Sequence, residues 1–170
     1  ASVANLNGGT TVTGLTTLTN GSLTVDGTTT SNSLNGGFTG TAGTMNVVGS
    51  NTFGGATAFN GTAATGLTVT TAGSNAFGVI SVGGTTVSAN VTFGGTTSAT
   101  SLTENNASSI VTVNGPLTTT GNLVLTNGTM ALNANNVIGG ATTLTAGTLK
   151  TTVNQPFGAS AVALTAANLQ

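Results

Sequence analysis

Charged side chains are almost absent from this chain. Its 170 residues include one Lys or Arg and two Asp or Glu, so only 2% are charged, whereas ordinary soluble domains have about 25%. The formal net charge is −1 and the mean hydropathy is +0.33, which excludes the low hydropathy and high net charge of disordered chains. A nearly neutral surface also gives little electrostatic protection against self-association. The composition therefore favours a folded protein that assembles with copies of itself.

Histidine, cysteine, tryptophan and tyrosine are missing altogether. Without His or Cys, neither a Cys–His pair nor a Ser–His–Asp triad can be assembled. The two carboxylates, Asp26 and Glu104, are far apart in the sequence, and a glycosidase needs such a pair to face one cleft. We therefore expect a protein that is not an enzyme, with no catalytic residues and no cofactor. Both carboxylates are interpreted as solvated turn or coil residues.

The lack of charge excludes further classes of protein. One Asp cannot supply the ligands of a glycine-rich calcium repeat, so we expect no metal site. Lys150 is the only cation, and binding to nucleic acid or to a membrane surface requires a basic patch. No apolar run reaches the roughly 18 residues of a membrane-spanning helix, so no membrane insertion is expected.

The chain starts Ala1-Ser2-Val3-Ala4 without an initiator Met, from which we expect an extracellular or cell-surface protein after signal-peptide removal.

What the chain does contain is Thr, Asn, Gly and small apolar residues in a strand-like alternation. Apolar and polar residues alternate with a period of two over 22–26, 67–70, 91–93 and 111–113, and Leu123 and Leu125 flank Val124. This pattern predicts half-buried strands, and the Asn-Gly and Gly-Gly pairs between them predict turns, because both residues accept positive φ. Gly and β-branched residues disfavour helices. Only the tail 159–169 has a helix-permissive composition, and its alternation fits a strand equally well.

A short motif recurs along the chain: an apolar residue or Asn, then Gly-Gly, then Ala or Thr, then Thr. Its glycine pairs are Gly8-Gly9, Gly54-Gly55, Gly83-Gly84, Gly94-Gly95 and Gly139-Gly140. Strands at this spacing allow a sandwich, a barrel or a solenoid, but internal repeats favour units that bury their apolar faces against neighbouring units. In a solenoid, like residues form ladders at about 4.8 Å, where charges repel and Asn can hydrogen-bond to Asn at the corners. We predict an all-β fold with little or no helix: a single β-solenoid (parallel β-helix) domain over 1–170.

The stretch Asn135–Leu149, NNVIGGATTLTAGTL, resembles the passenger-associated repeat of bacterial autotransporters. The matching features are an Asn-containing turn, Ile138, the pair Gly139-Gly140, Thr142 and the closing Ala-Gly-Thr-Leu, and a partial copy covers 49–57. The resemblance implies a secreted, right-handed parallel β-helix on the cell exterior. The first third of the chain is also similar to the Thr-Gly-Asn repeats of phage and giant-virus fibres.

Several Phe residues lie beside Gly. They are Phe53, Phe77, Phe93 and Phe157. We interpret them as an internal aromatic stack along one corner of the solenoid. The alternative is an exposed aromatic row that seals contacts between subunits.

The lone charges allow one more specific hypothesis. Lys150 and an Asn could form an isopeptide cross-link assisted by Glu104 as a buried carboxylate. The simpler interpretation is that both charged residues are exposed.

Together these observations predict a structural subunit of an extracellular filament or matrix fibre, self-assembling through β-strand contacts. Its main partner would be itself, with the cell surface or other matrix components as further partners. The alternative is an autotransporter-passenger-like adhesin, or a viral or phage fibre segment, that presents a binding surface. Strand edges at the two ends of a solenoid can pair with another chain. Segments 1–7 and 157–170, the latter released after Pro156, are candidate terminal arms for such pairing.

Overall fold

The computed structural model describes residues 2–61, 66–84 and 87–170 of the chain. All regular secondary structure in these ranges is β-strand, which confirms the predicted all-β solenoid. The strands are β1 (Val3–Asn7), β2 (Thr11–Val12), β3 (Thr16–Leu18), β4 (Ser22–Leu34), β5 (Phe38–Gly40), β6 (Gly43–Phe53), β7 (Thr57–Asn60), β8 (Leu67–Thr71), β9 (Asn75–Phe77), β10 (Val79–Gly83), β11 (Ala89–Phe93), β12 (Thr97–Ala99), β13 (Ser101–Glu104), β14 (Ile110–Val113), β15 (Leu117–Thr119), β16 (Leu123–Leu125), β17 (Thr129–Leu132), β18 (Val137–Ile138), β19 (Thr142–Leu144), β20 (Thr148–Thr151), β21 (Val162–Leu164) and β22 (Asn168–Leu169).

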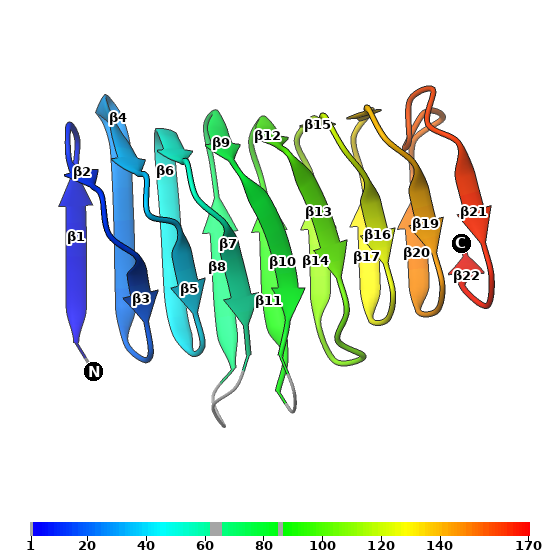
Figure 1. Ribbon diagram of the computed structural model, residues 1–170, viewed down its shortest axis with the longest axis horizontal. Coiled ribbons are helices and arrows are strands. Elements are labelled where there is room, and N and C mark those ends of the chain that lie inside the picture. Colours follow the sequence, from blue (N-terminus) through cyan, green and yellow to red (C-terminus); the bar gives the residue numbers. More distant parts are fainter. Residues whose placement is uncertain (1, 62–65, 85–86) are drawn as a thin grey trace.

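These strands stack in three columns, and the coils follow one another along the long axis of the molecule (Figure 1). The first column is β1, β4, β6, β8, β11, β14, β17, β20 and β22; the second is β2, β4, β6, β9, β12, β15 and β18; the third is β3, β5, β7, β10, β13, β16, β19 and β21. The long strands β4 and β6 belong to the first two columns and join them into one 14-stranded sheet, while the third column is an eight-stranded sheet. The pairings between the described strands are all parallel.

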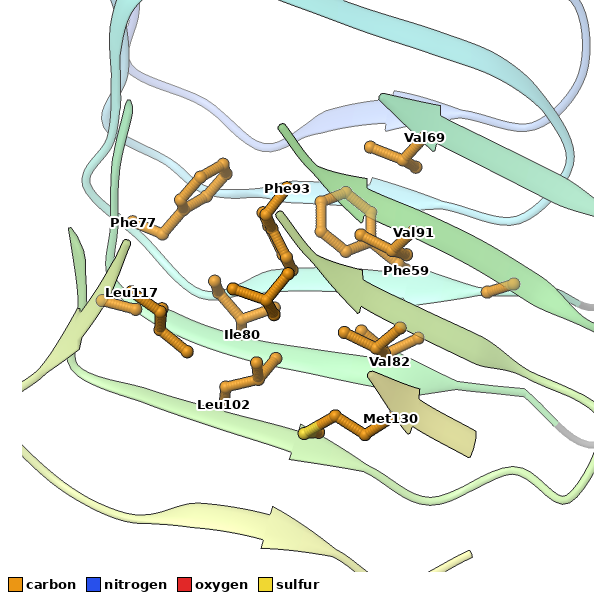
Figure 2. Packing of buried hydrophobic residues seen from close by; sticks show 14 of the residues in the cluster. Phe59, Val69, Phe77, Ile80, Val82, Val91, Phe93, Leu102, Leu117 and Met130 are labelled. Atoms are coloured by element: carbon orange, nitrogen blue, oxygen red, sulfur yellow. The ribbon is translucent and has the colours of Figure 1, made fainter. Parts of the chain in front are cut away.

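Inward-facing side chains form apolar ladders between the sheets. In the first column one ladder runs through Leu23, Met45, Val69, Val91, Val111, Met130 and Leu149, all buried. Figure 2 shows Val69 and Val91 in the same apolar interior as Val82 of the third column. Fully burying one such side chain stabilises the fold by about 1.5–3 kcal/mol. Because the core is thin, each coil depends on the coils beside it for this burial.

Alternation along most of the inner strands separates the inward and outward ladders. On β8, Leu67, Val69 and Thr71 are buried, whereas Thr68 and Thr70 are exposed. A shift of the pairing by one residue would exchange these two sets, so the pattern selects the register strongly. Threonine suits the outward positions, because its β-branched side chain fits the pleated surface of a sheet.

Both predicted arm segments lie on the solenoid as its end rungs. Strand β1 pairs with β4 along its whole length, and Leu6 lies opposite Val25. Strands β21 and β22 pair with β19 and β20, and Leu164 lies opposite Leu144. The physical reason is that both segments continue the inward apolar ladders of the neighbouring coils. The tail 159–169 accordingly forms short strands, as its alternation allowed.

Candidate functional site

The ten predicted turn glycines lie at three different corners of the coil. Gly8-Gly9 and Gly94-Gly95 separate a first-column strand from a second-column strand, and Gly54-Gly55 and Gly139-Gly140 lead from the second column to the third. Gly83-Gly84 lies at the end of β10, in the third column. Because the motif occupies different corners in different coils, its spacing in the sequence is irregular.

Two of these glycines illustrate why a larger residue would not fit. Gly84 has a φ of 132°, a conformation that residues with a side chain rarely adopt. Gly55 has no positive φ, but a Cβ added there would lie 2.6 Å from the backbone nitrogen of Gly37 in the preceding coil. Of the ten glycines only Gly8, Gly9 and Gly84 have positive φ. The motif is therefore a stacking element of the backbone and presents no functional side chain.

The predicted aromatic stack involves three of its four residues. Phe53 and Phe77 are stacked, with ring centroids 4.6 Å apart and an interplanar angle of 13°. Phe93 meets the edge of Phe77 at 6.0 Å, and Figure 2 shows these two rings side by side. All three are buried, so they cannot form an exposed row. Phe157 lies in the loop between β20 and β21, where it is partly buried against the core.

Glu104 occupies an inward position of β13, between Val82 of β10 and Leu125 of β16. It is fully buried, so the prediction of a solvated carboxylate is wrong for this residue. Its Oε1 accepts a hydrogen bond of 3.0 Å from the backbone N–H of Asn106, whereas its Oε2 has no hydrogen-bond partner among the described residues. Burial raises the pKa of Glu104 to about 7, and the Asn106 hydrogen bond opposes this shift.

Lys150 lies apart from Glu104. It occupies an outward, exposed position of β20, beside the inward Leu149. Lys150 belongs to the first column and is exposed, whereas Glu104 belongs to the third and points to the core. The structure therefore does not bring together the residues of the predicted isopeptide cross-link.

Asp26, on β4, does not pair with the other carboxylate. Its Oδ1 accepts hydrogen bonds from the backbone N–H of Thr28 at 2.9 Å and from the Thr28 hydroxyl at 2.7 Å. These two bonds, the hydroxyl bond first, lower the pKa of Asp26. Asp26 thus makes a local contact within β4, and the two carboxylates do not face one cleft.

A column of buried asparagines lines the start of the second strand column. The side-chain nitrogen of Asn32 donates to Oδ1 of Asn51 at 2.9 Å, and that of Asn51 donates to Oδ1 of Asn75 at 3.2 Å. Asn51 and Asn75 also donate to the backbone oxygens of Val48 and Ala72. Asparagine pairing at corners was expected in general, but these residues were not identified, because 19 residues separate the first pair and 24 the second.

A shallow groove of about 170 Å³ lies along this column. Its lining includes Ser50, Thr52, Ser74, Thr96 and Ser98, together with Asn51 and Asn75 of the column. These groups offer hydroxyls and amides but no charge. The groove can therefore form hydrogen bonds with a neutral polar partner, and it has no group for acid–base chemistry at neutral pH.

The end rungs expose apolar side chains that the inner rungs bury. Leu169 lies opposite Leu149 and Leu164 lies opposite Leu144 in their ladders. The exposed fractions of Leu169 and Leu164 are 48% and 51%, whereas those of Leu149 and Leu144 are 1%. At the other end, the first rung leaves Ala4 exposed in the same ladder as Leu169. Both ends thus present an apolar surface next to a strand edge.

The described residues contain no group of three or more side chains that could hold a metal ion. No helix that could cross a membrane occurs in the described ranges. No family model, curated protein or solved structure matches this chain.

Proposed function

We propose that this chain is a structural subunit that assembles end to end into an extracellular filament or matrix fibre. The observation that supports this proposal is the exposure of the apolar ladders at the end rungs. Leu164 and Leu169 have a neighbouring coil on one side only. A second copy, stacked with its strands parallel to those of the first, would bury these side chains against its own first rung. The same contact would pair the backbone groups of two open strand edges.

The charge distribution supports the same assembly. The end strands β1, β21 and β22 contain no charged side chain, and the formal net charge of the chain is −1. Copies brought together at their ends therefore experience little electrostatic repulsion.

A matched pair of variants tests the proposal. Leu169→Glu places a charge on the end rung, whereas Ile110→Glu places one on the side of the solenoid. The two parent side chains are similarly exposed, at 48% and 46%. We expect Leu169→Glu to raise the critical concentration for assembly about tenfold or more, because a leucine that the end-to-end contact would bury is replaced by a charge that must be desolvated. The Ile110→Glu variant should assemble like the unmodified chain.

Light scattering across a concentration series and negative-stain microscopy provide the measurements. The unmodified chain should form fibres that lengthen along the coil axis. Monomers at every concentration would contradict the proposal, and so would equal assembly of both variants. Antibody labelling of intact cells tests the extracellular location separately.

The hydroxyl-lined groove favours a second candidate function. A solenoid rod that presents this groove would act as an adhesin or fibre segment, as expected for an autotransporter passenger or a viral fibre. Such a rod remains discrete, with one length at all concentrations. Microscopy therefore distinguishes it from a polymerising subunit.

A further inference from the structure

One inward ladder of the third column contains a titratable residue in an otherwise apolar series. Phe59, Val82, Glu104, Leu125 and Leu144 follow one another in successive coils, and all are buried. Alternation along β13 requires an inward side chain at this position. An ionised carboxylate there is separated from water without a compensating charge, which is unfavourable, whereas a neutral carboxyl is tolerated far better.

The backbone around Glu104 closes the site tightly. A Cβ added to Gly128 in the following coil would lie 2.8 Å from Oε1 of Glu104. The loop 105–109 after β13 is held by two further contacts. Asn106 donates a side-chain hydrogen bond of 2.6 Å to the backbone oxygen of Gly84, and the Ser109 hydroxyl accepts one of 3.0 Å from the backbone N–H of Ala89.

No charged group compensates for Glu104. The strands paired with β13 are β10 and β16, and neither contains a titratable side chain. The loop 105–109 contains none either. The other charged side chains of the whole chain are Asp26 on β4 and Lys150 on β20. Among the described residues, the carboxyl therefore has one hydrogen bond, from the Asn106 backbone, and no ion pair.

We propose that Glu104 is a pH switch of the solenoid: its neutral carboxyl fits the apolar ladder, and its ionisation loosens β13 and the loop that follows. This inference concerns the folding of a single chain and does not rest on end-to-end assembly. The loop is the nearest route for water, since Asn105, Ala107 and Ser108 are exposed there. Ionisation should therefore break the loop contacts of Asn106 and Ser109 first.

The direction in which pH changes the stability of the fold follows from the raised pKa of Glu104. Burial raises the pKa of Glu104 from 4.5 to about 7. Below about pH 4.5 both the folded and the unfolded chain hold this proton, so the neutral form is fully compatible with folding. As the pH rises toward 7 the unfolded chain loses the proton first, and stability falls. Above about pH 7 the loss is complete, and the folding equilibrium constant should be lower by up to roughly 300-fold.

Urea unfolding from about pH 5 to pH 8.5 tests the switch, at a concentration where light scattering shows single chains. The unmodified chain should lose stability as the pH rises. Glu104→Gln keeps the shape of the neutral carboxyl and should remove this dependence. Glu104→Leu, which copies Leu125 in the ladder, should also be insensitive to pH and provides a second test if the glutamine variant folds poorly. Asp26→Asn should keep the full pH dependence.

Two local readouts separate this switch from a merely structural role of Glu104. The carboxyl carbon NMR signal of Glu104 should titrate near neutral pH. The exchange rates of the backbone amides of Asn106 and of Thr126, which donates to the Glu104 backbone oxygen, should rise over the same range beyond the ordinary effect of pH. A pH-independent stability of the unmodified chain would overturn the proposal, and so would a pH dependence in the Glu104→Gln and Glu104→Leu variants as large as that of the unmodified chain.

Discussion

Asn51 shows how much one polar side chain contributes to this thin core. It is 2% exposed, and its amide connects three coils through Asn32 and Asn75. It also satisfies the backbone oxygen of Val48. A buried amide of this kind stabilises the fold only because each of its polar atoms has a partner.

We expect Asn51→Ala to lower the free energy of unfolding by about 2–3 kcal/mol, because it leaves buried donors and acceptors of its neighbours unpaired. Asn114 is the matched control, since its Oδ1 accepts a 2.9 Å hydrogen bond from Asn133 at an exposed position. Asn114→Ala should change the free energy by less than about 0.5 kcal/mol. Urea titrations of both variants give the comparison. Equal decreases in the free energy of unfolding would show that burial does not determine how much the asparagine column stabilises the fold.

At the scale of elements, the strands β6, β9 and β11 meet through their aromatic side chains. Phe53 ends β6, Phe77 ends β9 and Phe93 ends β11, so the stack joins the first and second columns where the chain turns. Offset and edge-to-face contacts of this kind add about 0.5–1.5 kcal/mol to the burial of the rings. The aromatic cluster therefore stabilises the packing of the middle coils of the solenoid.

Phe53→Ala should lower the free energy of unfolding by about 3–5 kcal/mol, because it removes a stacked ring and leaves a cavity. Phe157→Ala, at a partly buried loop position, should cost less than about 1.5 kcal/mol. A double-mutant cycle with Phe77→Ala should give a coupling of about 0.5–1.5 kcal/mol. Additive losses would mean that the two rings contribute only through burial.

At the scale of the whole molecule, the near absence of charge removes a common source of salt dependence. Three charged side chains are spread over 170 residues. Glu104 is buried, and the other two, Asp26 and Lys150, lie in different coils. Screening by salt acts on exposed charges within about a Debye length of each other. Stability and assembly should therefore depend on the burial of apolar surface and only weakly on salt.

We expect the melting temperature to change by less than about 2 °C between 0.05 and 1 M sodium chloride, because little repulsion or attraction is available to be screened. Sodium sulfate should raise the melting temperature, since it strengthens the burial of apolar surface. Thermal unfolding followed by circular dichroism measures both. A strong effect of chloride at neutral pH would show that electrostatic interactions contribute more than this composition suggests.

The sequence by itself determined the class of structure. Alternation with a period of two, as at Leu23 and Val25, was sufficient to locate strands, because each strand buries one face. Recurrent Gly-Gly motifs were sufficient to favour stacked coils over a sandwich, because repeats bury their apolar faces against one another. The lack of His and Cys excluded the common catalytic arrangements without any structure.

Only the tertiary structure decided which residues meet between coils. The spacing of 19 residues from Asn32 to Asn51 and of 24 from Asn51 to Asn75 shows that coil length varies, so neighbours in adjacent coils cannot be found from a fixed repeat. Glu104 shares the face of Leu102 by local alternation, but that it is buried became clear only from the stacking of β13 between β10 and β16. The segments 1–7 and 157–170 looked like separate arms for the same reason. Strand faces are a local property of the chain, whereas ladders arise only when coils stack.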